Sequence, residues 1–446
     1  MNNNKLFYWS VVAALAGFLF GFDTVVISGA NQPIKEIWQT SDWFHGFFIM
    51  SMALWGTVLG ALFGGRPTEK YGRKKVLFWI GILYTVSALG SGLAPDPYTF
   101  SISRFIGGVG VGVSSVAAPA YISEISTTKS RGRLTAMYQF NIVFGILIAY
   151  ISNYFLKGVG GANDWRWMLG VEAIPAAIYT FMVLGIPESP RWLVSIRNDR
   201  DSARKILITA GEENPDREIE DIVRSNAEVS SSGKHENIFA SKYRTVLWLA
   251  FFVAFFNQFS GINFILYYAP QILTLIGLGE SQSLMNSIAI GGVNLVFTFV
   301  GLYLIDRMGR KSLLLLGSFG YIISLGMVAF AFASSASPAF LMTFLLLFIA
   351  SHAVGQGAVI WVLISEIFPN KTRALGQSFG ASTHWICAAL ITLVGPRVIS
   401  LFAGREWIIF AFFAFMMVLQ LIWVLTKVPE TKNVSLEDLE KRLIKH

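Results

Sequence analysis

Two opposite charges lie inside otherwise apolar stretches of the sequence. Asp23 follows Phe20-Gly21-Phe22 in the first stretch, and Arg104 begins the string RFIGGVGVG in the fourth. A charge inside a bilayer costs about 2.5–3.5 kcal/mol on insertion scales, so it needs a partner or a purpose. Two interpretations stay open: a permanent ion pair that fixes helix packing, or a site where protonation of Asp23 releases Arg104. Glu172, in the sixth stretch, has no evident partner, and we expect it near a membrane surface.

Side-chain amides also recur in the apolar stretches. They belong to Gln139, Asn257, Gln258, Asn263 and Asn294. An amide both donates and accepts hydrogen bonds, and an aromatic face such as that of Trp361 packs against C–H groups. Gly261 can break the seventh stretch and free backbone groups. As a set, these residues predict a binding site for a polyhydroxylated ligand such as a sugar, although any single amide could simply join two helices.

Two histidines stand in the same kind of surroundings. An intramembrane His is a functional candidate, and its imidazole titrates near physiological pH. His384 directly precedes Trp385, and we expect it to contact the ligand. His352 lies nine residues before Trp361, which places it on nearly the opposite face of a regular helix. It is an additional candidate, and the alternative is a neutral His that bonds to a neighbouring carbonyl.

The composition places these residues in a membrane. Apolar types form 54 % of the 446 residues and charged types 14 %, against roughly 25 % charged in soluble chains. Twelve stretches approach the roughly 20 residues that a span needs: 7–30, 45–65, 76–93, 99–120, 137–156, 168–186, 247–276, 284–305, 313–333, 339–364, 376–400 and 407–428. We therefore predict an all-α integral membrane protein with twelve transmembrane helices.

The basic residues predict an orientation. If the N-terminus is cytoplasmic, 29 of the 35 Lys and Arg residues fall on the cytoplasmic side, and Arg104 lies within a span. The other side holds the remaining five, Lys35, Lys157, Arg166, Arg397 and Arg405. This bias predicts a multi-pass protein of the cell inner (plasma) membrane with both termini in the cytoplasm. It also explains the net charge of +8 without a nucleic-acid partner.

Four motifs recur in the same order in the two halves of the chain. Ser123-Glu124-Ile125, Arg131 and Pro187-Glu188 return 242 residues later, and Gly72-Arg73-Lys74 returns 237 residues later. We predict two six-helix bundles, residues 1–186 and 247–429, a cytoplasmic linker at 187–246 with short helices near 199–209 and 216–228, and a cytoplasmic tail at 430–446. Repeats of this kind mark secondary transporters, whose substrate site lies between the halves near the midplane.

Charged residues gather at the cytoplasmic ends of the spans. They are Glu69, Arg73, Glu124, Arg131, Glu188 and Arg191 in one half, and Asp306, Arg310, Glu366, Arg373 and Glu430 in the other. Several ion pairs that cross between halves can shift an equilibrium between two conformations. We predict an inner gate that latches the outward-open form; the alternative is that the charges only anchor the topology.

Seven strings, among them the repeated motifs, resemble those of the sugar porter family of the major facilitator superfamily, and the likeness covers about 7–440. They are GGRPTEKYGRKK (64–75), RFIGGVGVG (104–112), PESPRW (187–192), NQFSGIN (257–263), DRMGRK (306–311), SEIFPNKTR (365–373) and PETK (429–432). The sequence is most similar to bacterial proton-coupled xylose and glucose symporters. The resemblance implies proton coupling at Asp23 with Arg104. It also implies sugar contacts at Gln139, Gln258, Asn263, Asn294 and Trp361, aromatic pocket positions at Phe20 and Trp385, and closure over the sugar by Tyr267.

The sequence departs from the family pattern at four places in the pocket. Asn257 replaces the first Gln of a pair, Ile146 replaces a second Gln of the fifth span, and His384 stands where relatives have Gln or Asn. The segment from Gly355 to Trp361 also lacks the usual Trp-Gly-Pro string, so we expect a smaller bend in the tenth span. These changes leave the identity of the sugar open.

We therefore predict a transporter that imports a monosaccharide, a hexose or a pentose, together with a proton by alternating access. An uncoupled facilitator and an exporter of another small polar solute are the alternatives. His-Glu-x-x-His, P-loop and Ser–His–Asp patterns are absent, so we do not expect an enzyme. We expect a monomer in the lipid bilayer, without cofactor or metal, since the single Cys387 excludes a cysteine-based zinc site.

Overall fold

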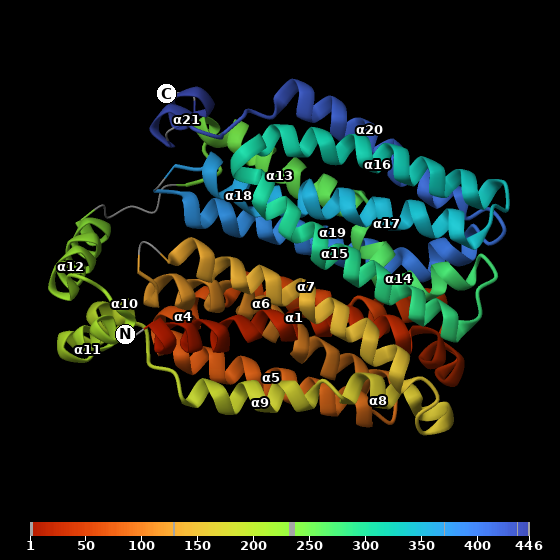
Figure 1. Cartoon of the computed structure of the whole chain (residues 1–446), viewed down its shortest axis with the longest axis horizontal. Helices are drawn as coiled ribbons and strands as arrows, with labels where there is room; N and C mark the ends of the chain where they lie inside the picture. Colours follow the sequence, from red (N-terminus) through yellow and green to blue (C-terminus); the bar gives the residue numbers. More distant parts are fainter. Residues whose placement is uncertain (1–2, 128–129, 232–236, 370, 435, 445–446) are drawn as a thin grey trace.

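The computed structural model describes residues 3–127, 130–231, 237–369, 371–434 and 436–444. Within these ranges the chain forms helices and no strands (Figure 1). Eleven helices are long and apolar enough to cross a membrane, and a twelfth span results if the bent pair Asp42–Met50 and Met52–Phe63 is counted as one. The predicted all-α membrane fold is confirmed.

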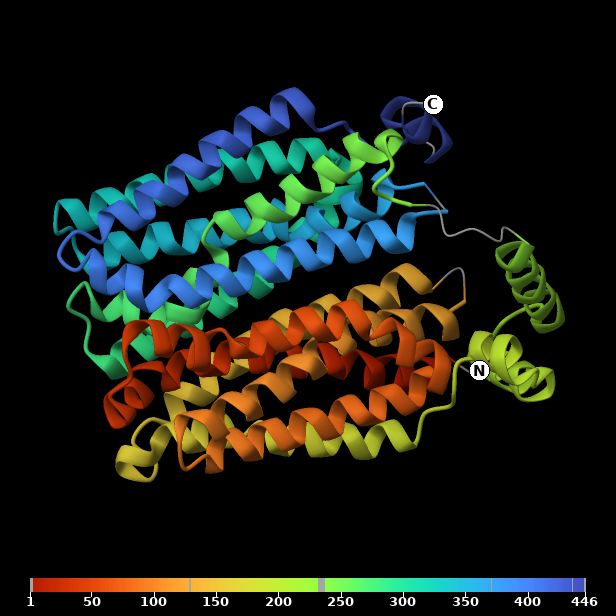
Figure 2. The same ribbon diagram turned by 180° about the vertical axis from the view of Figure 1, so that it is seen from behind.

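The helices form two groups that lie side by side in both views (Figures 1 and 2). The first bundle comprises α1 (Asn3–Trp38), α2 (Asp42–Phe44), η1 (His45–Met50), α3 (Met52–Phe63), α4 (Gly65–Tyr71), α5 (Arg73–Leu93), α6 (Pro97–Ile125), α7 (Arg131–Leu156), η2 (Gly161–Asn163), α8 (Asp164–Gly170) and α9 (Ala173–Leu184). The second bundle comprises α13 (Arg244–Phe259), α14 (Ile262–Thr274), α15 (Glu280–Met308), α16 (Arg310–Ala333), α17 (Pro338–Val354), α18 (Gln356–Ile367), α19 (Arg373–Leu401) and α20 (Trp407–Lys427).

The segments outside the bundles gather at one end of the molecule. The chain segment that connects the two bundles contains α10 (Pro190–Trp192), η3 (Leu193–Arg197), α11 (Arg200–Ala210), α12 (Pro215–Ser231) and η4 (Ser241–Tyr243). Helix α21 (Leu436–Leu443) follows α20. We call the end that carries both chain ends and α11 and α12 the terminus end, and the opposite one the far end (Figures 1 and 2). Helices α11 and α12 stand where the sequence predicts linker helices, and they bury a small apolar cluster of their own that includes Leu207 and Ile219.

Small residues set the spacing of the helices that carry the site. Helix α1 packs along α7, and a Cβ added at Gly21 would lie 1.8 Å from the carbonyl oxygen of Ile142. A Cβ at Gly145 would lie 2.1 Å from the carbonyl oxygen of Phe18. These helices can therefore approach closely only because glycine stands at both crossings.

Two spans of the second bundle are interrupted at glycines. Gly261 has φ +86°, a backbone conformation that favours glycine, and it separates α13 from α14 as predicted. Gly355 separates α17 from α18. Both interruptions occur inside membrane spans, where freed backbone groups and redirected side chains can face a cavity between the bundles.

Candidate functional site

Asp23 and Arg104 form a buried ion pair between α1 and α6. Arg104 Nη1 donates to Asp23 Oδ1 at 2.5 Å, and Arg104 Nη2 donates to the Asp23 backbone oxygen at 2.9 Å. Both side chains are 2 % exposed. The structure therefore brings together the two charges that the sequence singled out. Pairing is required by both interpretations, the packing pair and the proton site, and does not choose between them.

Glu172 lies beside this pair, and the expectation of a position near the membrane surface is wrong. The residue precedes α9, is 1 % exposed, and interacts electrostatically with both Asp23 and Arg104. Its Oε1 atom has no hydrogen-bond partner among the described residues. Tyr267 of α14 is also buried close enough to Arg104 to interact with it. The sequence gives no signal that Glu172 joins Asp23 and Arg104, because it meets them only through tertiary packing.

Three of the predicted amides form a hydrogen-bonded chain around the break at Gly261. Gln258 Nε2 donates to Asn257 Oδ1 at 3.1 Å, and Asn263 Nδ2 donates to Gln258 Oε1 at 2.8 Å. Gln258 Nε2 also lies 3.0 Å from His384 Nε2 and 3.2 Å from His384 Nδ1. All four side chains are buried. The helix break lets Asn263 turn back onto Gln258, and α19 adds the imidazole.

Aromatic rings surround the imidazole of His384. Its ring centroid lies 5.0 Å from that of Trp361 and 4.8 Å from that of Trp385. Phe20 of the first bundle packs against Trp385 with a centroid distance of 5.6 Å. Trp361 is 38 % exposed, whereas Phe20, His384 and Trp385 are buried. The cluster thus joins residues of both bundles, and Trp361 is its most exposed ring.

The remaining predicted pocket residues lie apart from this chain of bonds. Asn294 of α15 is buried and Gln139 of α7 is half-buried, and neither side chain hydrogen-bonds to a described residue. His352 lies in the last turn of α17, just before the break at Gly355, and its Nδ1 lies 2.7 Å from the hydroxyl of Tyr321. His352 also interacts electrostatically with His384. Its partner is therefore a tyrosine hydroxyl rather than the carbonyl considered from the sequence.

Hydrogen bonds cross between the bundles at the far end. Asn31 Nδ2 donates to Gln271 Oε1 at 2.9 Å, and the Tyr150 hydroxyl donates to the Leu266 carbonyl at 2.8 Å. His45 Nε2 lies 2.8 Å from Asn31 Oδ1 and completes a buried chain. Sequence reasoning missed Asn31, His45 and Gln271, although each is a polar residue in or beside an apolar stretch.

Two ion pairs also cross at the far end. Lys157 Nζ lies 2.6 Å from Glu280 Oε1, and Arg397 Nη1 lies 3.9 Å from Asp42 Oδ2. Lys157 also lies 3.3 Å from Asp164 of its own bundle. Burial by itself would lower the pKa of Lys157, but the two carboxylates outweigh burial and raise that pKa above its ordinary value.

At the terminus end the charged residues pair inside their own bundles. In the first bundle Arg73 Nη2 donates to Glu124 Oε1 at 2.9 Å, and Glu188 accepts from the backbone N–H of Lys74 at 3.0 Å. In the second bundle Arg310 Nη2 donates to Glu366 Oε1 at 2.7 Å. The repeated sequence motifs therefore build the same network twice.

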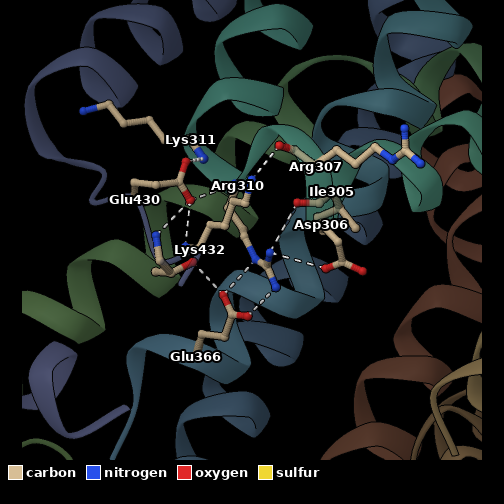
Figure 3. A network of polar contacts seen from close by, with 9 residues as sticks. Ile305, Asp306, Arg307, Arg310, Lys311, Glu366, Glu430 and Lys432 are labelled. Atoms are coloured by element: carbon tan, nitrogen blue, oxygen red, sulfur yellow. Dashed lines mark hydrogen bonds and ion pairs between the residues drawn. The ribbon is translucent and has the colours of Figure 1, made fainter. Parts of the chain in front are cut away.

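Figure 3 shows the network of the second bundle. Glu430 accepts from the backbone N–H groups of Arg310 and Lys311 at 2.9 and 3.1 Å, and Arg310 Nη1 lies 3.6 Å from Asp306. Four further predicted gate residues, Glu69, Arg131, Arg191 and Arg373, have no ion pair with a described residue. Among the described residues no such pair joins the two bundles here, so the latch of the outward-open form stays a prediction.

The described residues contain no group of three His, Cys, Asp or Glu side chains that could hold a metal ion. The site offers amides, imidazoles and indoles for a neutral polar ligand, and two carboxylates with one guanidinium for a proton.

A family model described as "Sugar (and other) transporter" matches residues 9–443. The D-xylose transporter of Levilactobacillus brevis is 36 % identical over 438 residues, which cover 96 % of this chain and 94 % of that protein. The arabinose-proton symporter of Bacillus subtilis (strain 168) is 34 % identical over 98 % of this chain and 94 % of its own length. The galactose-proton symporter of Escherichia coli (strain K12) is 35 % identical over 100 % of this chain and 96 % of its own length.

Solved structures are also similar. The inward-open conformation of the xylose transporter XylE from E. coli superposes with a TM-score of 0.86 at 30 % identity and covers 98 % of this chain and 100 % of that one. A partially occluded inward-open conformation of the same protein gives a TM-score of 0.85, with 97 % and 100 % covered.

Proposed function

Because this chain belongs to the sugar (and other) transporter family, we propose that it imports a monosaccharide together with a proton. Relatives that are 34–36 % identical over nearly the whole chain are named for the transport of D-xylose, or of arabinose or galactose with protons. A hexose or a pentose is accordingly the proposed substrate, and the bilayer surrounds the protein.

The sugar site that we propose lies at the amide and aromatic cluster. The single observation that carries the proposal is the chain that joins Asn263, Gln258 and His384, with the His384 ring against the partly exposed Trp361. Amides can exchange their mutual hydrogen bonds for bonds to sugar hydroxyls, and an indole face suits the C–H side of a pyranose. Phe20 adds a contact from the first bundle, so a bound sugar would affect the packing of both bundles.

The proton site that we propose is the cluster of Asp23, Arg104 and Glu172. When all three are ionised, two carboxylates and one guanidinium leave one uncompensated negative charge in a buried place. A proton on either carboxylate removes this charge, and an interior of low dielectric favours that neutral cluster. A proton on Glu172 leaves the ion pair of Asp23 and Arg104 intact, whereas a proton on Asp23 weakens it and would change the packing of α1 against α6.

The transport cycle that we propose is alternating access by rocking of the two bundles. The crossing bonds at the far end and the superposition on inward-open structures support an inward-open state here. We place the terminus end in the cytoplasm, because it carries most of the Lys and Arg residues. Sugar and a proton would then enter from the far end when its crossing bonds part, and leave at the terminus end.

The test is sugar-dependent proton movement in proteoliposomes, with xylose, arabinose, galactose, glucose and one disaccharide. We expect one monosaccharide to drive alkalinisation of the outer medium. Asp23→Asn should abolish this signal while counterflow of the same sugar continues. Counterflow without proton movement in the wild-type protein would make it a facilitator.

A second variant tests the sugar site separately. Gln258→Ala removes the amide that bonds to Asn257, Asn263 and His384, so we expect a loss of sugar affinity of about tenfold or more, since buried polar groups are left unpaired. Gln377→Ala is a suitable control, because it makes the same change at an exposed position of α19 outside the proposed site. An unchanged affinity in Gln258→Ala would refute the proposed location of the sugar.

A further inference from the structure

A hollow of about 640 Å³ opens at the terminus end of the first bundle, away from the proposed sugar and proton sites. It lies between the beginning of α5, the end of α9 and the turn η3. Three cations line it: Lys74 and Lys75 from α5, and Arg197 from η3. The hollow therefore presents several positive charges beside the membrane-spanning helices.

Two of the three cations have no carboxylate partner among the described residues. Lys75 is exposed and forms no ion pair, and the Arg197 guanidinium lies 5.4 Å from the ring centroid of Trp192. Lys74 differs, because its Nζ donates to the Leu184 carbonyl at 2.9 Å and so joins α5 to α9. Lys75 and Arg197 are therefore free to bind an anion.

The two carboxylates that line the hollow already accept other hydrogen bonds. Glu188 Oε1 accepts from the backbone N–H groups of Lys74 and Ser189 at 3.0 and 2.8 Å. Asp199 Oδ1 accepts from the Ser202 N–H at 3.0 Å at the beginning of α11, and these bonds hold the pKa of Asp199 below its ordinary value. One oxygen of each carboxylate is thus held by the local fold, and neither carboxylate forms an ion pair with Lys75 or Arg197.

The rest of the lining is apolar and continues onto the outside of the bundle. Phe78 and Leu184 form the wall, and Leu184 is 55 % exposed. Beyond them the exposed side chains of Trp79 on α5 and Phe181 and Ile178 on α9 lead away from the hollow along membrane-spanning helices. A ligand at the cations therefore has an adjoining apolar surface that faces lipid.

The second bundle does not repeat these features. The lysine that corresponds to Lys74 is Lys311, and its Nζ likewise donates to a helix-end carbonyl, that of Leu425, at 3.3 Å. The residue that corresponds to Lys75 is Ser312, and the one that corresponds to Trp192 is Val434. The free cation and the indole are thus additions to the first bundle that the repeated network does not require.

We propose that this hollow binds the phosphate headgroup of an anionic phospholipid, with the acyl chains along α5 and α9. Lys75 and Arg197 supply charge-assisted hydrogen bonds to the phosphodiester, and basic pockets at the edge of spanning helices bind such headgroups. The exposed Tyr71 supplies an aromatic ring of the kind typical of the membrane interface. A soluble phosphate would use the cations but not the adjoining apolar surface.

Native mass spectrometry of the full-length, delipidated protein tests this proposal. Phosphatidylglycerol and phosphatidylcholine with identical acyl chains are added in turn. We expect preferential binding of phosphatidylglycerol, and a loss of the bound fraction of about fivefold or more in Lys75→Gln/Arg197→Gln. The matched control, Lys427→Gln/Arg307→Gln, removes two exposed cations from the terminus end of the second bundle and should change binding less than about twofold.

A charge-preserving variant separates recognition from folding. Lys75→Arg/Arg197→Lys should retain phosphatidylglycerol binding, and a loss in this variant would contradict the proposal. Equal binding of both lipids, or equal losses in the neutralised pair and its control, would also overturn it. Inorganic phosphate that binds with the same dependence on Lys75 and Arg197, without preference for the anionic lipid, would assign the hollow to a soluble anion instead.

Discussion

At the far end of the molecule polar side chains bond across the two bundles, whereas at the terminus end the same kinds of group pair inside each bundle. Asn31 reaches Gln271 of the other bundle, but Arg310 reaches Glu366 of its own. Bonds that cross must break before the far end can open. Bonds inside a bundle move with it and remain intact when the bundles rock.

The two sets of contacts therefore contribute to two different quantities. These are the free-energy difference between conformations and the free energy of unfolding of each bundle. Crossing bonds at the far end stabilise a conformation in which this end is closed relative to one in which it is open. The networks at the terminus end stabilise each bundle in every state of the cycle. Substitutions at the two ends should therefore be separable, with a shift of conformation at one end and a loss of stability at the other.

The largest effect should come from a covalent bond across the far end. In a Cys387→Ser background, Asn31→Cys/Gln271→Cys treated with a short, reducible thiol cross-linker should lose sugar counterflow by about tenfold or more, since the bundles can no longer part. A reducing agent should restore it. Arg204→Cys/Asp216→Cys cross-links two neighbouring positions inside the linker, away from the interface between the bundles, and should leave the rate nearly unchanged. Equal inhibition of both pairs would contradict the comparison.

A smaller shift should follow from Asn31→Ala. This change leaves His45 Nε2 and Gln271 Oε1 without the partner that Asn31 supplies, which costs about 1–3 kcal/mol in the conformation whose far end is closed. Hydrogen–deuterium exchange should increase in α2, η1 and α14. Asn153→Ala is the matched control, because Asn153 is equally buried but donates to the Val26 carbonyl of its own bundle. The control should lower the melting temperature without a local increase at the far end.

At the terminus end we expect a change in stability. Arg310→Gln leaves the Glu366 carboxylate short of its main donor and should destabilise the second bundle by about 1–3 kcal/mol. A thermal-shift measurement should show a lower melting temperature, with a similar decrease for Arg73→Gln in the first bundle. A melting temperature equal to that of the wild type would show that the network does not stabilise the bundle.

The smallest effect should come from Lys157→Gln, because Lys157 and Glu280 are partly exposed and such pairs contribute about 0–1 kcal/mol. The raised pKa of Lys157 gives the sign of the pH dependence. The contribution is complete below the ordinary value of 10.5 and is lost as the pH rises through the higher, folded-state value. Titration of Lys157 should therefore not alter hydrogen–deuterium exchange at the far end between about pH 6 and 8. Added salt should alter this exchange weakly, because it screens the ion pair.

The residues inside the apolar stretches could be selected from the sequence, but their partners could not. The twelve apolar stretches, the glycine break at 261 and the duplicated charged motifs all follow from local composition, and the structure contains each of them. The expectation for Glu172 was wrong because its neighbours Asp23 and Arg104 belong to other helices. The far-end chain through His45 and Asn31 was missed for the same reason.

The sequence alone determined the membrane-spanning helices, their duplication and the types of side chain that can bind a sugar or a proton, because hydrophobicity, helix breaks and repeated motifs are properties of short segments. The tertiary structure decided which charges meet, which amides share hydrogen bonds and at which end polar groups bond across the two bundles. Those outcomes depend on how the helices pack against one another, and many arrangements are compatible with the same local pattern.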